Sequence, residues 1–168
     1  MVKTRSVILA LLLILPVLLT ISSARAEQPY QHLMPLLIDL DGWQGKKPDG
    51  MSMDMPGGSM TTASREYQKG SARATAMVVV GQTAVGALTP MVTGTNINSS
   101  EGHMLTDTIN GMKVLKTYTT AKKAGALLVA LDKDAMFSFS YNGLTEDEAL
   151  ALAEKFDWKA IQAAAKSK

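Results

Sequence analysis

The sequence predicts an α+β domain, in which an antiparallel sheet of about five to seven strands carries a short N-terminal helix and a C-terminal helix on one face. Three observations predict this class. Segments of alternating apolar and polar residues recur between residues 51 and 142. An Asn-Gly pair joins two of them. The clearest helix start in the chain, at Thr145, follows the last of these segments.

The first 26 residues have the pattern of a secretory signal peptide. Lys3 and Arg5 precede an apolar run from residue 7 to 21, and Ala24-Arg25-Ala26 offers small residues for cleavage. The run is short for a membrane span, although an uncleaved anchor is the alternative. We therefore expect a signal peptide at 1–26 and a single globular α+β domain at 27–168. Cleavage near Ala26 would give a periplasmic or secreted product with no stable membrane span.

The charge of the chain changes once this segment is set aside. The whole chain has 17 Lys and Arg against 15 Asp and Glu, a formal net charge of +2. Lys3, Arg5 and Arg25 lie in the segment, so residues 27–168 hold fourteen bases against fifteen acids. A near-neutral domain lacks the basic surface of a nucleic-acid-binding protein. The chain has no cysteine, so disulfides are excluded and methionine is its only source of sulfur ligands.

The residues after the signal peptide predict a short helix, a loop and a strand. Leu and Met side chains gather around Pro35 within residues 27–40, which favours a helical turn. Residues 41–50 are rich in Gly, Asp, Lys and Pro, so we expect a loop. The strict alternation from Met51 to Met55 predicts a strand.

The next sixty residues predict two hairpins and a helix. Residues 61–69 and 72–80 are typical of strands joined through Gly70-Ser71. Apolar residues at helix-like spacing predict a short helix over 82–92, followed by a loop over 93–102. Two strands, 103–109 and 113–120, are then joined through Asn110-Gly111, which is the strongest two-residue hairpin signal.

The C-terminal part predicts a last hairpin and a terminal helix. Residues 126–131 and 136–142 favour two strands. Thr145 and Glu148 form a capping box, which predicts a helix that begins after Thr145. Asp157 is expected to cap a second helical stretch that contains Trp158.

The order of these elements resembles a known group of exported domains. A strand ending at Gly143, the capped acidic turn from Thr145 to Glu148 and a following helix are similar to the last unit of several exported bacterial domains. With Asp41-Gly42-Trp43 after a leader helix, the pattern resembles small uncharacterised periplasmic proteins with a PsbP-like α/β sandwich. The resemblance covers most of residues 27–168 in element order. It implies a binding or accessory module and supplies no catalytic residue.

Methionines between residues 51 and 60 are the main candidate metal ligands. Met51, Met53, Met55 and Met60 place four thioethers within ten residues, and thioethers are soft ligands that select Cu(I). His103, at a strand start, is a further candidate ligand. The alternative is packing: adaptable methionines on one strand face fill the core, while Ser52 and Asp54 face water.

Other catalytic or metal-binding patterns are weak. His32 and His103 are the only histidines, and zinc needs three or four ligands. Ser99-Ser100 precede Glu101 and His103, but catalytic triads are assembled from distant elements, so this serine run gives little support for a hydrolase.

The sequence thus favours an exported, non-enzymatic binding or accessory protein without a cofactor, whose partner is a protein or small-molecule ligand. A periplasmic copper-binding protein that uses Met51 to Met60 is the first alternative, with copper as its ligand. An unrecognised hydrolase is the second. Methionine placement separates the first two, because sulfurs that converge at the surface favour metal and sulfurs dispersed in a core favour packing.

Overall fold

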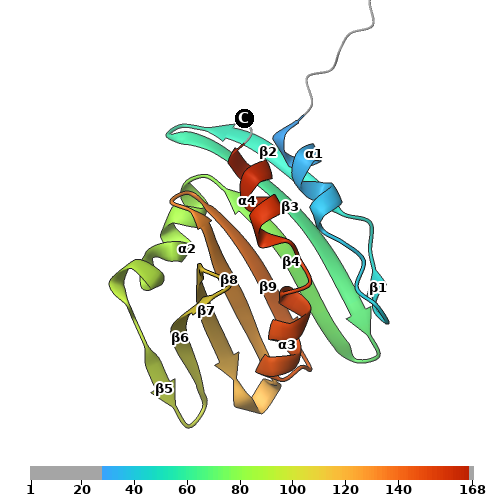
Figure 1. Cartoon of the computed structure of the whole chain (residues 1–168), viewed down its shortest axis with the longest axis vertical. Coiled ribbons are helices and arrows are strands. Elements are labelled where there is room, and N and C mark those ends of the chain that lie inside the picture. The colour runs from blue at the N-terminus through green and yellow to red at the C-terminus, as the bar shows by residue number, and fades with distance from the viewer. Residues whose placement is uncertain (1–27, 167–168) are drawn as a thin grey trace, which may run out of the picture.

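The computed structural model describes residues 28–166 and contains a nine-stranded antiparallel sheet with four α-helices (Figure 1). The predicted α+β class is confirmed. The signal peptide and its cleavage at Ala26 lie outside the described residues. The strands are β1 (Gln44–Gly45), β2 (Asp49–Met55), β3 (Gly58–Lys69), β4 (Ala72–Val80), β5 (Ile97–Ser99), β6 (Gly102–Ile109), β7 (Met112–Thr119), β8 (Ala124–Asp132) and β9 (Ala135–Asn142).

The sheet has the strand order β1-β3-β4-β9-β8-β7-β6-β5, and β2 pairs with β3 beside β1. The expected number of about five to seven strands is therefore too low. The two strands that the sequence does not reveal, β1 and β5, lie in segments expected to be loops. Both are edge strands of two or three residues, and they form because β3 and β6 offer unpaired backbone groups to them. So short a strand has no periodicity to recognise.

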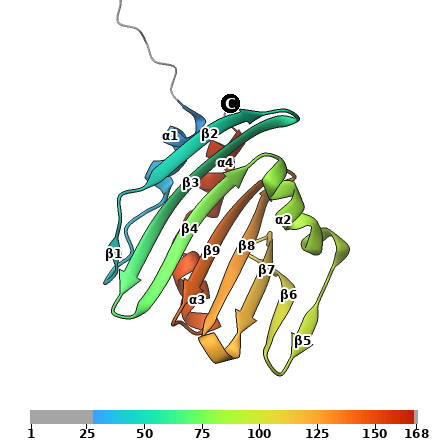
Figure 2. The same cartoon turned by 180° about the vertical axis from the view of Figure 1, so that it is seen from behind.

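The helices lie on both faces of the sheet. The helices α1 (Pro29–Leu33), α3 (Glu146–Ala153) and α4 (Trp158–Lys166) cover one face, together with the 3-10 turn η1 (Met34–Leu36). A second 3-10 turn, η2 (Thr120–Lys122), joins β7 to β8. The helix α2 (Gln82–Thr93) packs on the opposite face, where much of the sheet stays open (Figure 2). The expected packing of the terminal helices on one face is thus confirmed, and α2 adds a cover to the other face.

The main core lies between the sheet and the terminal helices. Phe137 of β9 contacts Phe156 at a ring-centroid distance of 5.1 Å and Trp158 at 6.5 Å. All three side chains are buried, and they join strand β9 to the segment between α3 and α4 and to the first residue of α4. Burial of such aromatic rings gives the largest apolar contribution per residue, so this cluster fixes α3 and α4 on the sheet.

The C-terminal helices begin where the sequence predicts them to begin. The Thr145 hydroxyl accepts from the Glu148 backbone N–H, and the Glu148 carboxylate accepts from the Thr145 backbone N–H at 2.8 Å. Asp157 caps α4 by accepting from the Ala160 backbone N–H at 2.9 Å. Among residues 28–166, no helix has both the length and the apolarity needed to cross a membrane.

Candidate functional site

The methionines of the β2–β3 hairpin lie on the sheet face that α2 occupies, which we call the α2 face. Met53 pairs directly with Met60 across the hairpin, and Met51 pairs with Thr62. Thr62 in turn pairs with Val79, whose side chain packs in the same cluster as the buried side of α2. Because directly opposed residues share a face, Met51, Met53 and Met60 all project from the α2 face. The backbone of Met55 continues the same alternation and pairs with Gly58.

These methionines do not lie in the core. Met51 is 47% exposed and Met53 is 36% exposed. The packing interpretation is therefore wrong for both, because nothing among the described residues buries them. The prediction that Ser52 faces water is also wrong. Its side chain is half-buried on the opposite face, and its hydroxyl lies 3.1 Å from the Thr61 hydroxyl.

Met60 is held at the surface by the start of α2. The Thr83 hydroxyl donates a hydrogen bond to the Met60 Sδ at 3.1 Å. Thr83 lies in the first turn of α2, which begins after Gly81. This hydrogen bond from a neighbouring helix restricts the rotamers of the Met60 side chain and so orients its sulfur.

His103 lies apart from the methionines. It is on β6, five strand spacings from β3, or about 24 Å along the sheet. Its side chain contacts Tyr118 and Glu146 on the face that α3 covers, opposite to the α2 face. The structure does not bring His103 to Met51, Met53 or Met60, so the expected contribution of His103 to a methionine site is wrong.

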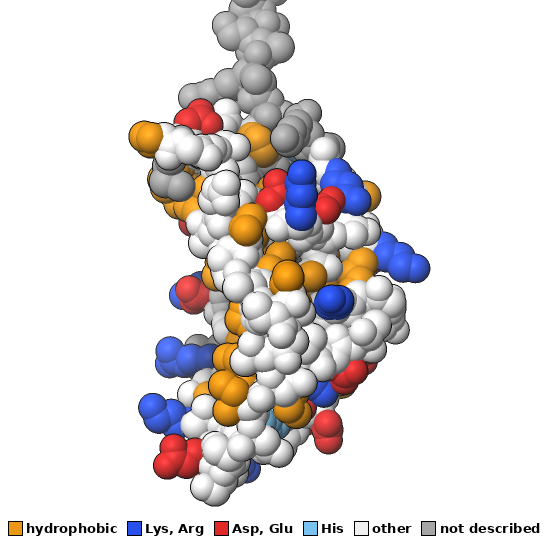
Figure 3. Space-filling model, turned by 90° about the vertical axis from the view of Figure 1, so that its left-hand side faces the viewer, with side chains coloured by type: hydrophobic (Ala, Val, Ile, Leu, Met, Phe, Trp, Pro, Cys, Tyr) orange, Lys and Arg blue, Asp and Glu red, His pale blue; other side chains and the backbone are white. Residues whose placement is uncertain are grey.

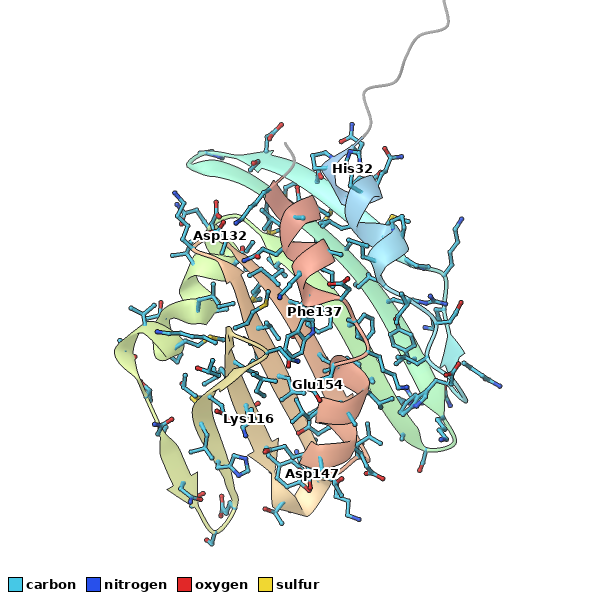
Figure 4. The ribbon with its side chains drawn as sticks, viewed as in Figure 1. His32, Lys116, Asp132, Phe137, Asp147 and Glu154 are labelled. Carbon is cyan, nitrogen blue, oxygen red and sulfur yellow. The ribbon has the colours of Figure 1, made fainter. Side chains whose placement is uncertain are left out.

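Instead, His103 belongs to a polar cluster that joins the sheet to α3. Its Nε2 is hydrogen-bonded to the Glu146 Oε2, and the other carboxylate oxygen lies 3.7 Å from Lys116 Nζ. Lys116 also donates to the Asp107 Oδ2 at 3.2 Å. Figure 4 shows Lys116 on the sheet beside α3. The side chains of His103, Glu146 and Lys116 are 22%, 22% and 17% exposed, so water only partly screens these contacts.

A buried tyrosine lies next to this cluster. Tyr141, Gly125, Tyr118 and His103 are successive neighbours across β9, β8, β7 and β6. The Tyr141 hydroxyl is buried and has no hydrogen-bond partner among the described residues. Burial raises the pKa of Tyr141 well above its usual range, and the nearby Glu146 carboxylate and Tyr118 add to this effect. Neutral Tyr141 therefore fits its apolar environment, and its hydroxyl is the least satisfied polar atom of the cluster.

The local serine, acid and histidine run does not form a triad. The Ser99 hydroxyl donates to the Gly102 carbonyl at 2.9 Å and accepts from the Glu101 backbone N–H. These bonds close a turn between β5 and β6, while His103 faces Glu146 instead. His32 lies on α1, which is distant from this turn both in sequence and in the fold. Among the described residues, no three His, Asp or Glu side chains are grouped as metal ligands.

Two shallow grooves border the α2 face. One, of about 560 Å³, lies where β1 meets β3 and β4, and its lining includes Lys46, Glu66 and Arg73. The other, of about 290 Å³, lies between α2 and the strands β7 and β8, and its lining includes Val92 and Lys113. The first is charged and the second is mostly apolar. Figure 3 shows hydrophobic side chains gathered in a band on the side of the molecule that carries α2 and β5.

Comparison with known proteins gives no match: no family model, no curated protein and no solved structure is similar to this chain. The resemblance to PsbP-like periplasmic proteins thus stays a prediction from element order.

Sequence reasoning found the methionines but missed the partners of His103. The sequence places Glu146 at a helix start, and no motif marks Lys116 as its partner. Glu146 lies 43 positions after His103, and only the fold brings the two together. The strand alternation that places Lys116 on the same face as Tyr118 was the one available clue.

Proposed function

We propose that the protein is an exported, non-enzymatic binding protein that docks a protein partner on its α2 face. One observation carries the proposal. Six large hydrophobic side chains are exposed among the residues whose exposure the structure describes, and five of them lie on β2, α2 or β5 on the α2 side: Met51, Met53, Val85, Val92 and Ile97.

The exposed side chains are too large and too concentrated to be incidental. Val92 is 81% exposed on α2, and Ile97 on the edge strand β5 is 54% exposed. Single exposed apolar residues are normal on any surface, whereas a group on one face is typical of an interaction site. Partly exposed hydroxyls, including those of Thr62 and Ser138, lie between the apolar positions and provide hydrogen-bonding groups.

The shape of this face favours a protein over a small molecule. From β2 to β5 the sheet spans seven strand spacings, or about 34 Å. A standard protein interface covers about 800 Å² on each partner, which fits within such a face. Small ligands instead prefer concave, mostly apolar pockets. The larger groove on this face is lined by Lys46, Glu66 and Arg73, so it supplies the charged rim that surrounds the apolar part of many interfaces.

The experiment places a photoreactive side chain at Ile97 or Val92 and, as controls, at Ala151 or Lys159, which are exposed on α3 and α4. Irradiation in the cells that produce the protein is expected to give one defined adduct from the α2 face only. The purified partner should then bind saturably to the wild type and to Ala151→Asp, and at least tenfold more weakly to Val92→Asp. Equal adducts from both faces, or equal binding by the two Asp variants, would contradict the proposal.

A hydrolase is the competing function. It would need a nucleophile within reach of a base, and the Ser99 hydroxyl is instead engaged with the Gly102 carbonyl. A broad screen of ester, amide and phosphoester substrates tests this point. Turnover by the wild type that is lost in His103→Ala would favour the hydrolase and overturn the non-enzymatic part of the proposal.

A further inference from the structure

We propose that Met51, Met53 and Met60 form a Cu(I)-binding site at the β2–β3 hairpin. The site occupies one end of the α2 face, but it does not depend on a protein partner. It goes beyond the proposed function by assigning a ligand of stated chemistry to three named sulfurs.

Packing does not explain these methionines. Met51 and Met53 are exposed, and exposed strand positions gain little from an unbranched apolar side chain. The neighbouring positions of the same hairpin, Ser52 and Thr61, carry the short hydroxyl side chains expected on an ordinary strand. What a methionine offers at the surface that leucine does not is its polarizable thioether sulfur.

The three methionines are close enough to bind one ion. Met53 and Met60 are directly opposed, so their Cβ atoms lie about 5 Å apart, and Met51 is the diagonal neighbour of Met60 at about 7–8 Å. Metal–sulfur bonds of about 2.3 Å require sulfurs around one ion to lie roughly 4 Å apart. Each thioether is separated from its Cβ by rotatable bonds, so three side chains at these positions can meet above the sheet without movement of the backbone.

Thr83 fixes the position of one of the three sulfurs. Its hydroxyl donates to the Met60 Sδ, which leaves the second sulfur lone pair free for a metal. Groups that hold a ligand in place raise metal affinity, and their loss typically costs tenfold or more. Thr83 is therefore a positioning residue for the site.

The chemistry of the donors selects the ion. Thioethers are neutral and soft, so they suit Cu(I) and its analogue Ag(I) rather than Zn(II), which prefers imidazole, thiolate and carboxylate. His103 is too distant to contribute, and the Asp54 carboxylate alternates onto the opposite face. The oxygen atoms beside the sulfurs belong to the neutral hydroxyls of Thr62 and Thr83. The site thus has no imidazole or carboxylate that would retain a divalent ion.

The decisive experiment titrates Cu(I) into the purified protein against the chromogenic chelator bicinchoninate under reducing conditions. The test variant changes Met51, Met53 and Met60 to Leu, which keeps apolar volume and removes sulfur. The matched control changes Met77 of β4, Met104 of β6 and Met136 of β9 to Leu, three methionines that pack in or against the buried side chains beneath α2. One equivalent of Cu(I) should bind to the wild type and to the control, with at least a hundredfold loss in the hairpin variant.

Two further measurements make the assignment specific. Ag(I) should shift the methyl NMR signals of Met51, Met53 and Met60 and leave those of Met77 and Met136 unchanged. Thr83→Val, which is nearly isosteric, should weaken Cu(I) binding about tenfold. Equal Cu(I) affinity of the wild type and the hairpin variant would overturn the proposal. Ag(I) shifts confined to Met77 and Met136 would overturn it as well.

These outcomes are separable from those for the protein partner. Met51 and Met53 also belong to the proposed docking surface, so the hairpin variant tests copper binding alone. The Val92→Asp variant should weaken the partner and still bind copper, since Val92 lies on α2 away from the three sulfurs.

Discussion

The imidazole of His103 on β6 is hydrogen-bonded to the carboxylate of Glu146, the first residue of α3, and this contact ties an outer strand to the start of a helix. Glu146 also lies 3.7 Å from Lys116 on β7. One carboxylate therefore holds α3 to two strands at once. Its position in the first helical turn is favourable as well, because the helix N-terminus carries partial positive charge.

Replacement of Glu146 by Ala should destabilise the fold. Hydrogen bonds to charged groups contribute about 1.5–3 kcal/mol, so we expect the free energy of unfolding to fall by about 2 kcal/mol. Asp147→Ala is the matched control, since Asp147 is the next residue of the same turn but is exposed. It should lose no more than about 1 kcal/mol, from its interaction with the helix terminus. Urea unfolding measures both, and equal losses would mean that the sheet contacts of Glu146 contribute nothing.

Gly125 should not tolerate a side chain. A Cβ at this position would lie 2.0 Å from the Thr117 carbonyl oxygen and 2.7 Å from the Tyr141 hydroxyl. Gly125→Ala is therefore expected to cost more than about 2 kcal/mol through overpacking. Gly86, inside α2, faces open space, so Gly86→Ala should instead stabilise the protein by about 0.5–1 kcal/mol. Thermal unfolding of the two variants should shift the midpoint in opposite directions, and a shift of the same sign would contradict this account.

The two buried tyrosines should respond differently to loss of the hydroxyl. The Tyr67 hydroxyl donates to the Ile38 carbonyl at 2.7 Å, so Tyr67→Phe should lower the free energy of unfolding by about 1 kcal/mol. The Tyr141 hydroxyl has no partner among the described residues, so Tyr141→Phe should be neutral or stabilising by up to about 1 kcal/mol. Denaturant unfolding of the pair decides the point. A loss in Tyr141→Phe as large as that in Tyr67→Phe would indicate a hydrogen bond to water at Tyr141.

Local patterns predicted most of the fold, because the elements concerned carry their own signals. Asn110-Gly111 adopts the two positive φ values that a tight hairpin needs, and Thr145 makes the capping box that its spacing with Glu148 indicates. The edge strands β1 and β5 were missed since their pairing depends on β3 and β6 alone. The sheet face that α2 covers could not be predicted either. Periodicity identifies the apolar face of a helix, but it does not say which face of the sheet that helix packs on.

Only the part of the candidate site that lies on a single strand could be predicted from the sequence. The alternation of Met51 and Met53 correctly placed both side chains on one face, but their exposure depends on which part of that face α2 covers. The link between Met60 and Thr83 joins two elements, and no spacing rule connects them. Residue type alone suggests grouping His103 with the methionines, whereas β6 lies five strand spacings from β3 and His103 projects from the other face of the sheet.

Stability should fall at alkaline pH. Burial raises the pKa of Tyr67 to about 12, with the Arg65 charge opposing the shift, while an unfolded tyrosine titrates near pH 10. Between about pH 10 and 12 the unfolded state loses this proton and the folded state keeps it, so the free energy of unfolding falls by up to about 1.4 kcal/mol per pH unit. Below pH 10 the contribution is constant. Tyr141 acts in the same direction. Unfolding measured from pH 9 to 11.5 should show a shallower decline in Tyr67→Phe, and an unchanged slope would contradict the assignment.

Oxidation should distinguish the hairpin methionines from the buried ones. Met51 and Met53 are 47% and 36% exposed, whereas Met91 of α2 is 3% exposed, so dilute hydrogen peroxide should convert the first two to sulfoxide several-fold faster. Peptide mass spectrometry over a time course measures each rate. Because a coordinated sulfur has its lone pair engaged, stoichiometric Ag(I) should slow oxidation of Met51 and Met53 and leave that of Met91 unchanged. Fast oxidation of the hairpin in the presence of Ag(I) would show that these sulfurs hold no soft metal, whereas slow oxidation without Ag(I) would show that the hairpin is covered in solution.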